Sequence, residues 1–299
     1  MQIFSQPIKM PIDCIKSAVN LWLNHPTKAT ARYGRIEEWD TSKVADMTGL
    51  FANQLCFNDD ISRWDVANVT CMSSMFHNAP AFNQDLSGWD VSRVTDMSGM
   101  FLFAQAFNQN LNKWNVRRVT NMSRMFYYAT KFNQDLSGWD VSSVTDMTIM
   151  FQNATSFNQD LGAWDVSSAT YMASMFQSAT SFEQDLSGWD VSHVNHMPSM
   201  FHKATTLTTT LQRTRNVSSF FDGQYRAMPI EERQKVFAGI FKWKRRAAFM
   251  IFLVNHGYIY SASVASNYEQ QATKPIGEMV PCDIIFDVED IARYICLFL

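Results

Sequence analysis

Several features that mark common classes of protein are missing from this chain of 299 residues. Its five cysteines are scattered and form no C-x-x-C pair, which argues against a cysteine-based zinc site or a disulfide framework and favours a reducing compartment. With 25 Lys+Arg against 28 Asp+Glu, the formal charge of −3 gives no case for nucleic-acid binding by the chain as a whole. Only 11 glycines are present, and no G-x-S-x-G or phosphate-loop motif points to a nucleophile or a nucleotide site.

Long hydrophobic runs are absent as well. The longest apolar run, near Ala247–Val254, is far shorter than a bilayer requires, so we expect no transmembrane segment. The first residues, Met1–Pro11, lack the charged and apolar regions of a secretory signal. These observations favour a cytoplasmic or other intracellular location.

What the chain does have is a hydrophobic fraction of 46%, with 18 methionines and 23 phenylalanines that follow one short pattern. Tryptophan recurs with a constant step of 25 residues, at Trp39, Trp64, Trp89, Trp114, Trp139, Trp164 and Trp189. A methionine stands eight residues after each Trp and a phenylalanine twelve residues after it. A fixed period of this length indicates stacked repeats, and seven copies exceed the roughly three that a continuous core requires.

The spacing within one copy predicts the shape of a coil. Trp89 and Val91 are two residues apart, so on a strand both side chains face the core while Asp90 faces outward. Apolar residues from Met97 to Phe107 then step by three and four, the spacing of a helical stripe. The sequence therefore predicts an α/β fold, a leucine-rich-repeat-like solenoid of about seven 25-residue coils with a parallel sheet.

The two ends of the repeat array differ from the repeats. We expect a helical N-terminal cap over residues 1–35, with a helix over Ile12–Leu23 that ends before Pro26, because a solenoid must cover its open core edges. The repeats occupy residues 36–211. After them the copies decay, and helix-like patterns predict a small, mostly helical C-terminal domain over residues 212–299.

The repeat motif W-D-V-S-x-V-T-D-M-S-x-M-F, followed by A-x-x-F-N-Q-D-L, resembles the BspA-like surface-protein repeat family, also called the mycoplasma lipoprotein repeat, over Ile36–Leu211. The lead-in, from Ala18–Trp22 to Ala31–Ile36, resembles the helical cap that precedes these repeats in proteins of unicellular algae, which suggests an algal-type member with a C-terminal helical extension. The resemblance implies a leucine-rich-repeat-like solenoid for adhesion or partner binding, without catalytic residues. It also implies the cell surface as an alternative location, because bacterial members are often exported and anchored.

Two sets of residues invite a metal interpretation, and for both we favour a simpler one. The column after each Trp holds Asp in six of seven copies, as in Asp90, which is compatible with either a ladder of cations or turns in which each Asp accepts bonds from the residue two positions on. The turn interpretation is favoured because no glycine-framed calcium loop accompanies the column. His193, His196 and His202 fall in the last full copy, where His196 replaces a turn Asp, and we predict no metal site and no cofactor there.

Outward positions where one copy departs from the others are the candidates for a binding site, because the scaffold columns are nearly uniform. The third and fourth copies depart most, and they supply the predicted partner-binding patch, which comprises Leu102, Phe103, Lys113, Arg117, Arg118, Arg124, Tyr127, Tyr128 and Lys131. Stacking should bring these residues together, and aromatic and Arg side chains favour an acidic or aromatic-accepting protein partner. Ordinary drift of surface residues is the alternative.

A second basic cluster comprises Lys242, Trp243, Lys244, Arg245 and Arg246. It would dock to an anionic surface or simply form the solvated end of a helix. The function predicted from the sequence is a non-catalytic repeat scaffold for protein–protein, adhesion-like interactions. The alternatives are an enzyme with a site in the C-terminal domain, near Asn255–Tyr260, and a structural matrix element that associates with itself.

Overall fold

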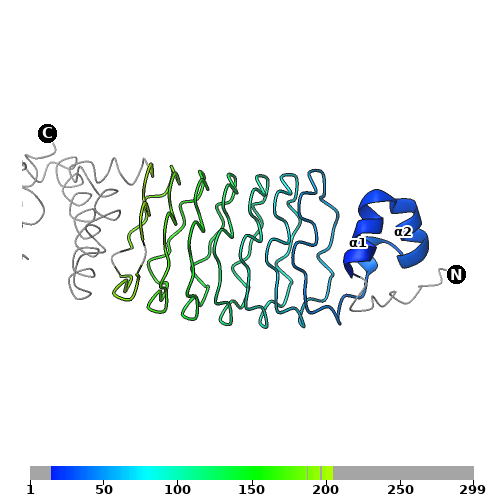
Figure 1. Ribbon diagram of the computed structural model, residues 1–299, viewed down its shortest axis with the longest axis horizontal. Coiled ribbons are helices and arrows are strands. Elements are labelled where there is room, and N and C mark those ends of the chain that lie inside the picture. The colour runs from blue at the N-terminus through cyan, green and yellow to red at the C-terminus, as the bar shows by residue number, and fades with distance from the viewer. Residues whose placement is uncertain (1–14, 187, 196, 205–299) are drawn as a thin grey trace, which may run out of the picture.

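The computed structural model describes residues 15–186, 188–195 and 197–204, which form a row of narrow coils behind a small helical unit (Figure 1). The predicted C-terminal domain, the cluster from Lys242 to Arg246 and the candidate enzyme site near Asn255–Tyr260 lie outside the described residues. The division of the chain into three domains therefore stays a prediction.

The N-terminal unit contains α1 (Ile15–Asn24), α2 (Pro26–Tyr33) and the short 3₁₀ helix η2 (Ile36–Glu38). In α1, the buried residues are Ile15, Ala18 and Val19, and the helix ends one residue later than expected. Pro26, expected to follow the helical segment, instead begins α2, a position where its missing N–H and fixed φ are favourable. The unit is therefore a helical hairpin rather than a single helix.

This hairpin covers the open end of the first coil. Ile15, Ala18 and Val19 belong to the same buried cluster as Trp39, the first Trp of the repeat series. The Trp22 ring meets Trp39 edge-on at 5.9 Å, and its Nε1 donates a hydrogen bond of 2.7 Å to Oδ2 of Asp59. The first indole of the stack is thereby shielded on the side where no preceding coil exists.

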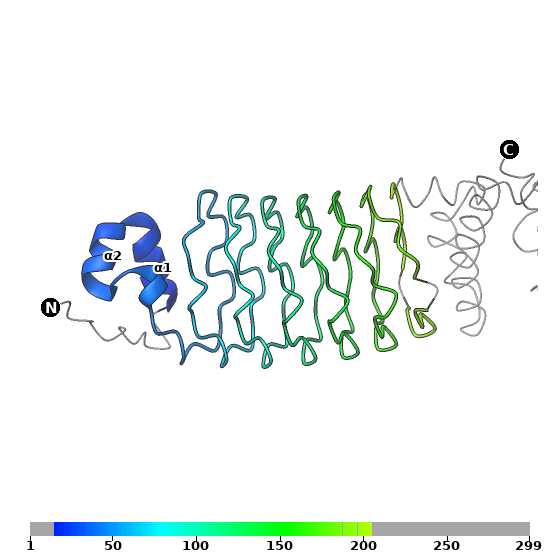
Figure 2. The same cartoon turned by 180° about the vertical axis from the view of Figure 1, so that it is seen from behind.

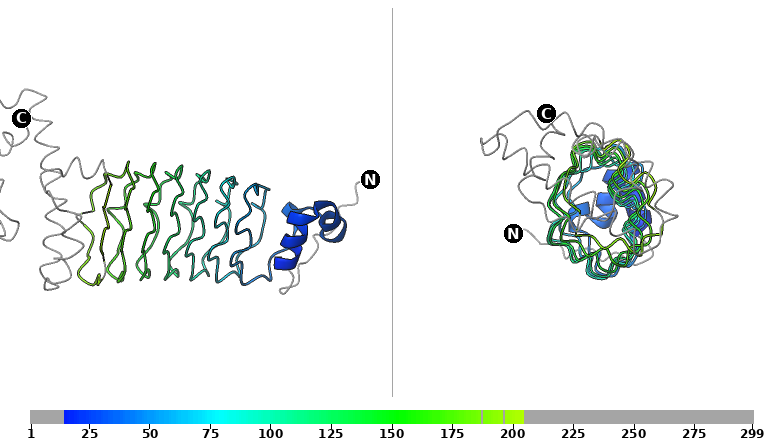
Figure 3. Two further views of the ribbon diagram at one scale, coloured as in Figure 1. Left: turned by 45° about the horizontal axis from the view of Figure 1, so that its top comes forward. Right: turned by 90° about the vertical axis from the view of Figure 1, so that its left-hand side faces the viewer.

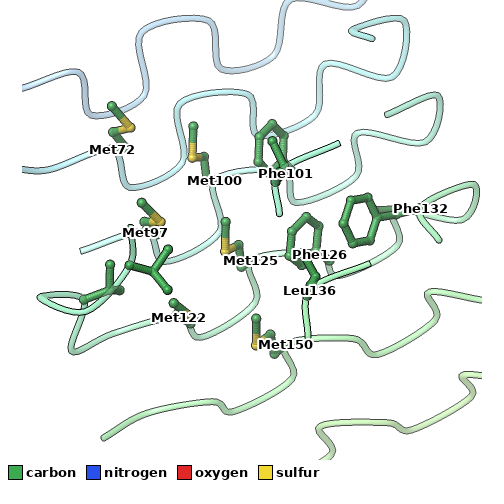
Figure 4. Close-up of a cluster of buried hydrophobic side chains, with 14 of the residues drawn as sticks. Met72, Met97, Met100, Phe101, Met122, Met125, Phe126, Phe132, Leu136 and Met150 are labelled. Carbon is green, nitrogen blue, oxygen red and sulfur yellow. The ribbon is translucent and has the colours of Figure 1, made fainter. Parts of the chain in front are cut away.

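Behind the cap, coils of 25 residues lie one after another, and seen end-on they superimpose in one outline (Figures 2 and 3). Equivalent side chains of neighbouring coils stack in the interior: the Trp114 and Trp139 rings are 6.4 Å apart and nearly parallel, and Phe126 lies 5.5 Å from Phe151. Methionines fill the space beside the phenyl rings (Figure 4). The repeat period therefore produces one continuous core of stacked columns.

The predicted parallel sheet is not formed, so the α/β leucine-rich-repeat-like solenoid fold is wrong. Within the described ranges, β pairing is limited to isolated bridges, among them a column of parallel bridges from Asp46–Cys71 to Asp146–Tyr171. At the expected strand, the N–H groups of Trp89 and Val94 instead donate to carbonyl groups three residues earlier, which is the pattern of turns. The predicted alternation of buried and exposed side chains is correct, because Trp89 and Val91 are buried and Asp90 between them is exposed.

The predicted helical turns from Met97 to Phe107 are also wrong, although their apolar residues are buried as expected. Alternate N–H groups bond to the next coil, as Phe101 N–H does to the Met125 carbonyl and Phe103 N–H to the Tyr127 carbonyl, both within 2.9 Å. The N–H groups between them close tight turns within the coil. We call the segment from Met97 to Phe107, and its equivalent in each coil, the turn arm. Because half of its N–H groups donate to the next coil, the hydrogen bonds of an α-helix are not formed.

This arm is built around two residues per coil with positive φ, four positions apart. One column holds Gly49, Ser74, Gly99, Arg124, Ile149, Ser174 and Ser199, and the other holds Asn53, Asn78, Phe103, Tyr128, Asn153, Ser178 and Lys203. Gly and Asn are the residues that adopt the left-handed region at least cost. Gly, Asn or Ser occupies both positions in three of the seven coils, which is the local signal for this turn geometry.

Candidate functional site

Hydrogen-bond ladders hold every coil to its neighbours in the same register. The Oδ1 atom of Asn108 accepts the backbone N–H of Asn133 at 2.9 Å, and Asn58, Asn83, Asn133 and Asn158 each accept the equivalent N–H one coil later. The indole Nε1 of Trp114 donates to the Leu86 carbonyl at 2.9 Å, a contact repeated by Trp64, Trp89, Trp139, Trp164 and Trp189. Since the backbone is the same in each copy, outward positions 25 residues apart are directly comparable.

Three positions in a coil, which we call corners, can carry a turn that an Asp or Asn side chain closes, and all three hold Asp in the coils of Trp89 and Trp139. In the coil that contains Trp89, the Oδ1 atoms of Asp85, Asp90 and Asp96 accept the N–H groups two residues on, at 2.8–3.0 Å. This geometry confirms the turn interpretation of the column after Trp. The hydroxyl and the N–H of Ser92 lower the pKa of Asp90 below its usual value, and the same two groups of Ser142 lower the pKa of Asp140.

The described part of the chain contains no group of three His, Cys, Asp or Glu side chains placed to hold a metal ion. Of the three histidines in the last full copy, His193 has its Nδ1 atom 3.1 Å from the Ser192 hydroxyl, and His202 is half-buried. His196 lies outside the described residues.

These corners predict that the fold loses stability in acid. A carboxylate whose pKa is lower in the folded than in the unfolded chain stabilises the fold above the unfolded pKa, about 4 for Asp, and loses that contribution as the pH falls through the folded pKa. Asp60, Asp85, Asp90, Asp135, Asp140, Asp165 and Asp190 all have lowered pKa values. The urea midpoint, followed by circular dichroism, should therefore fall steadily below about pH 5.

The matched control replaces Asp140 and Asp165 with Asn, which keeps an acceptor at the corner but cannot titrate. Asn115 shows that the amide suffices, since its Oδ1 accepts the Arg117 N–H at 3.3 Å. The double variant should lose part of the acid sensitivity. An unchanged pH profile would show that these corners do not control acid stability.

The outward surface of the turn arm differs between the middle and the ends of the stack. On either side of the middle, its side chains form amide contacts between coils: Asn78 Nδ2 donates to Asn53 Oδ1 at 3.0 Å, and Gln152 Nε2 donates to Gln177 Oε1 at 2.9 Å. In the middle, aromatic side chains occupy the same positions. The rings of Phe103, Tyr127 and Tyr128, which we call the ring patch, lie 4.9–5.2 Å from one another.

Two members of the ring patch hold an unfavourable backbone conformation. Phe103 and Tyr128 both have φ of 58°, in a column that otherwise carries Asn, Ser and Lys. For a bulky L-residue the left-handed region costs roughly 1–2 kcal/mol. Backbone strain of this kind tends to cluster at functional sites, so the ring patch is the candidate site that the geometry favours.

The structure brings together only part of the predicted patch. Phe103, Tyr127 and Tyr128 form one cluster, and Leu102 is half-buried in the same column as Tyr127. The basic residues of the patch are all exposed; they are Lys113, Arg117, Arg118, Arg124 and Lys131. No ion pair or side-chain hydrogen bond between described residues joins them to the rings.

One neighbour of the ring patch was not predicted. The His77 imidazole lies 6.3 Å from the Phe103 ring at an interplanar angle of 29°. The sequence carried a signal for it, because His77 occupies the position 25 residues before Leu102 and 50 before Tyr127. The first aromatic side chain of this column therefore lies two coils before Tyr127.

Comparison with known proteins gives a family but no characterised relative. No curated protein and no solved structure matches the chain. In the part of the chain that the structure describes, no helix has both the length and the apolar character needed to cross a bilayer. Residues 24–139 and 103–216, together more than half of the sequence, match a repeat family described as "Mycoplasma protein of unknown function, DUF285". The chain therefore belongs to the DUF285 family of repeat proteins.

Proposed function

We propose that this chain is a non-catalytic repeat scaffold whose ring patch binds a protein partner. The observation that carries the proposal is that three adjacent outward positions hold aromatic rings, two of them on left-handed backbone, where other coils hold small or polar residues. The fold does not need those rings, because equivalent coils form the same turns with Asn, Ser or Gln. An aromatic cluster that costs stability and fills no part of the core is best explained by an external contact.

The physical character of the patch suits protein recognition. Tyrosine offers a large apolar surface with a polar hydroxyl, and aromatic side chains are enriched among the residues that dominate binding energy. Hydrogen bonds between coils hold the backbone at the patch itself, since the Phe103 N–H donates to the Tyr127 carbonyl at 2.8 Å and the Tyr128 N–H to the Gln152 carbonyl at 2.9 Å. Binding to such a preformed surface loses little conformational entropy.

We also propose that the chain is a BspA-like member of its repeat family. The motif resembles that of the BspA-like surface proteins, with an algal type of N-terminal cap, and adhesion-like binding fits that resemblance. The DUF285 match supports the repeat family at a coarser level.

The test replaces the rings with the residues that other coils use. A triple variant carrying Phe103→Asn, Tyr127→Gln and Tyr128→Asn should keep the fold and gain stability, because Asn tolerates positive φ. In an affinity capture from the native source, followed by mass spectrometry, proteins retained by the unaltered chain should be lost with the triple variant. Thermal unfolding measured by circular dichroism checks that the fold is intact.

The matched control is Ser178→Asn, which lies in the same positive-φ column as Phe103 and Tyr128 but away from the rings. It should stabilise the fold slightly and leave capture unchanged. A triple variant that captures the same proteins as the unaltered chain would refute the proposed site.

A further inference from the structure

Charge is sharply segregated along the repeats. Residues 36–96 carry ten Asp and Glu against three Lys and Arg. From Met97 to Gln134 there is no acidic residue but five basic ones, Lys113, Arg117, Arg118, Arg124 and Lys131, which we call the cationic belt. Residues 132–192 reverse the pattern and contain no Lys or Arg, while their acidic residues are Asp135, Asp140, Asp146, Asp160, Asp165, Glu183, Asp185 and Asp190.

The structure shows how the belt loses its negative charge without losing its turns. In the coil of Trp114, residues 110–134, all three corner carboxylates are replaced by amides, namely Asn110, Asn115 and Asn121. Each amide oxygen still accepts the N–H two residues on, at 2.9, 3.3 and 3.0 Å respectively. The three replacements therefore keep the corner geometry and change only the charge.

The neighbouring coils keep their carboxylates at every corner. Asn110 is flanked in its column by Asp85 and Asp135, Asn115 by Asp90 and Asp140, and Asn121 by Asp96 and Asp146. Neighbouring coils are close, since equivalent rings of adjacent coils lie 5.5–6.4 Å apart. The belt is therefore one coil wide, with acidic corners on both sides.

Most of the belt's charge is left open to a partner. In the described structure its one ion pair joins Arg117 Nε to Asp140 Oδ2 at 3.8 Å, and the Arg117 side chain remains 78% exposed. A pair so long and so exposed contributes little and leaves the guanidinium available. Lys113 and Arg118 are exposed on the same arm of the coil.

The belt also runs through the ring patch. Along the Trp114 coil, exposed Arg124 precedes Tyr127 and Tyr128, and exposed Lys131 follows them, while the apolar residues between them face the core. The tyrosines are half-buried, so part of each ring is open to solvent. Along this one coil, a cationic side chain, two aromatic rings and a second cationic side chain thus follow one another.

We infer that the ring patch, with Arg124 and Lys131, binds a short acidic segment of the partner protein. This inference rests on the proposed function. Carboxylates of the segment would pair with Arg124 and Lys131, and an apolar or aromatic side chain between them would pack on Phe103, Tyr127 and Tyr128. Charge complementarity supports this occupant, because residues 97–134, which contain the belt, are the longest stretch of the described repeats without an acidic residue.

The width of the belt favours a peptide over a nucleic acid. A nucleic acid duplex carries about one negative charge per 1.7 Å of its length and extends over many bases. Laid on this surface, it would meet the acidic corners of the coils before and after the belt. A short peptide that follows one coil avoids both.

The experiment uses the full chain and labelled synthetic peptides. Fluorescence anisotropy should show that the peptide Glu-Glu-Leu-Phe-Glu-Glu binds at least about tenfold more tightly than Gln-Gln-Leu-Phe-Gln-Gln, and that added salt weakens this binding. The double variant Arg124→Gln, Lys131→Gln should lose about tenfold in affinity for the acidic peptide. The control variant Lys43→Gln, Arg63→Gln removes two charges outside the belt and should bind normally.

Equal binding of the two peptides, or an undiminished affinity in the Arg124→Gln, Lys131→Gln variant, would overturn the inference. Tighter binding of a short single-stranded RNA than of the acidic peptide would do the same in favour of a nucleic acid. These outcomes are separable from failure of the proposed function: if the ring variant abolishes partner capture while the charge variant does not, the ring patch remains a binding site and only the acidic partner is refuted.

Discussion

Replacement of Trp114 by Ala is expected to lower the free energy of unfolding by about 3–5 kcal/mol, the range for removing a large buried aromatic side chain. The indole is 2% exposed, stacks on Trp139 with ring centroids 6.4 Å apart, and lies 6.4 Å from Phe101. The change would open a cavity in the middle of the stack and leave the Leu86 carbonyl without its indole donor. Urea unfolding followed by circular dichroism measures the loss.

Two controls separate packing from hydrogen bonding in this experiment. Trp114→Phe keeps an aromatic ring in the column but removes the indole N–H, so it should cost about 1–3 kcal/mol for the lost indole hydrogen bond and the smaller ring. Arg117→Ala alters an exposed side chain of the same coil and should stay within about 0.5 kcal/mol. A nearly neutral Trp114→Ala variant would contradict the continuous stacked core.

The interior of the repeats could be predicted from the sequence because burial depends on spacing alone. A column that repeats every 25 residues meets its own copies in a stack, whatever backbone conformation carries it. Trp89, Met97 and Phe101 were therefore assigned to the core correctly, and all three are less than 5% exposed. The same reasoning identified Asp90 as an outward residue held by its own turn.

The backbone conformation could not be predicted in this way, because the same apolar spacing fits more than one local structure. Trp89 and Val91 alternate as on a strand, yet the corners at Asp85, Asp90 and Asp96 leave no straight segment long enough for a sheet. The three-and-four spacing after Met97 matches a helix, but alternate N–H groups bond to the next coil. The contrary signal was the recurrence of Gly, Asn and Ser four residues apart, as at Gly49 and Asn53.

Part of the candidate site could be predicted by comparing the repeat copies position by position. That comparison identified Phe103, Tyr127 and Tyr128, which the structure places within 5.2 Å of one another. The comparison did not identify His77, because the residues at this position differ from copy to copy and a single histidine among them does not stand out. It also could not show which basic residues lie near the rings, since their relation depends on the cross-section of the coil.

Proline substitutions at two adjacent residues should differ in effect by about 3 kcal/mol or more, and this contrast distinguishes the observed turns from the predicted helix. Ser174 has φ of 55°, and its N–H donates to the Pro198 carbonyl at 2.8 Å. Proline fixes φ near −65° and has no N–H, so Ser174→Pro would lose both the conformation and the hydrogen bond between coils. Ala173→Pro should be tolerated, because Pro198 already occupies the equivalent position one coil later.

Thermal unfolding of the two variants by circular dichroism provides the comparison. Ala173→Pro should unfold close to the unaltered chain, or slightly higher, since proline at a compatible position restricts the unfolded state. In the predicted helix, which would begin at Met172 in this coil, both substitutions would fall in the first turn, where proline is tolerated because the N–H groups have no partner within the helix. Equal tolerance of the two prolines would therefore restore the helical interpretation of this arm, and with it would remove the reason for regarding Phe103 and Tyr128 as strained.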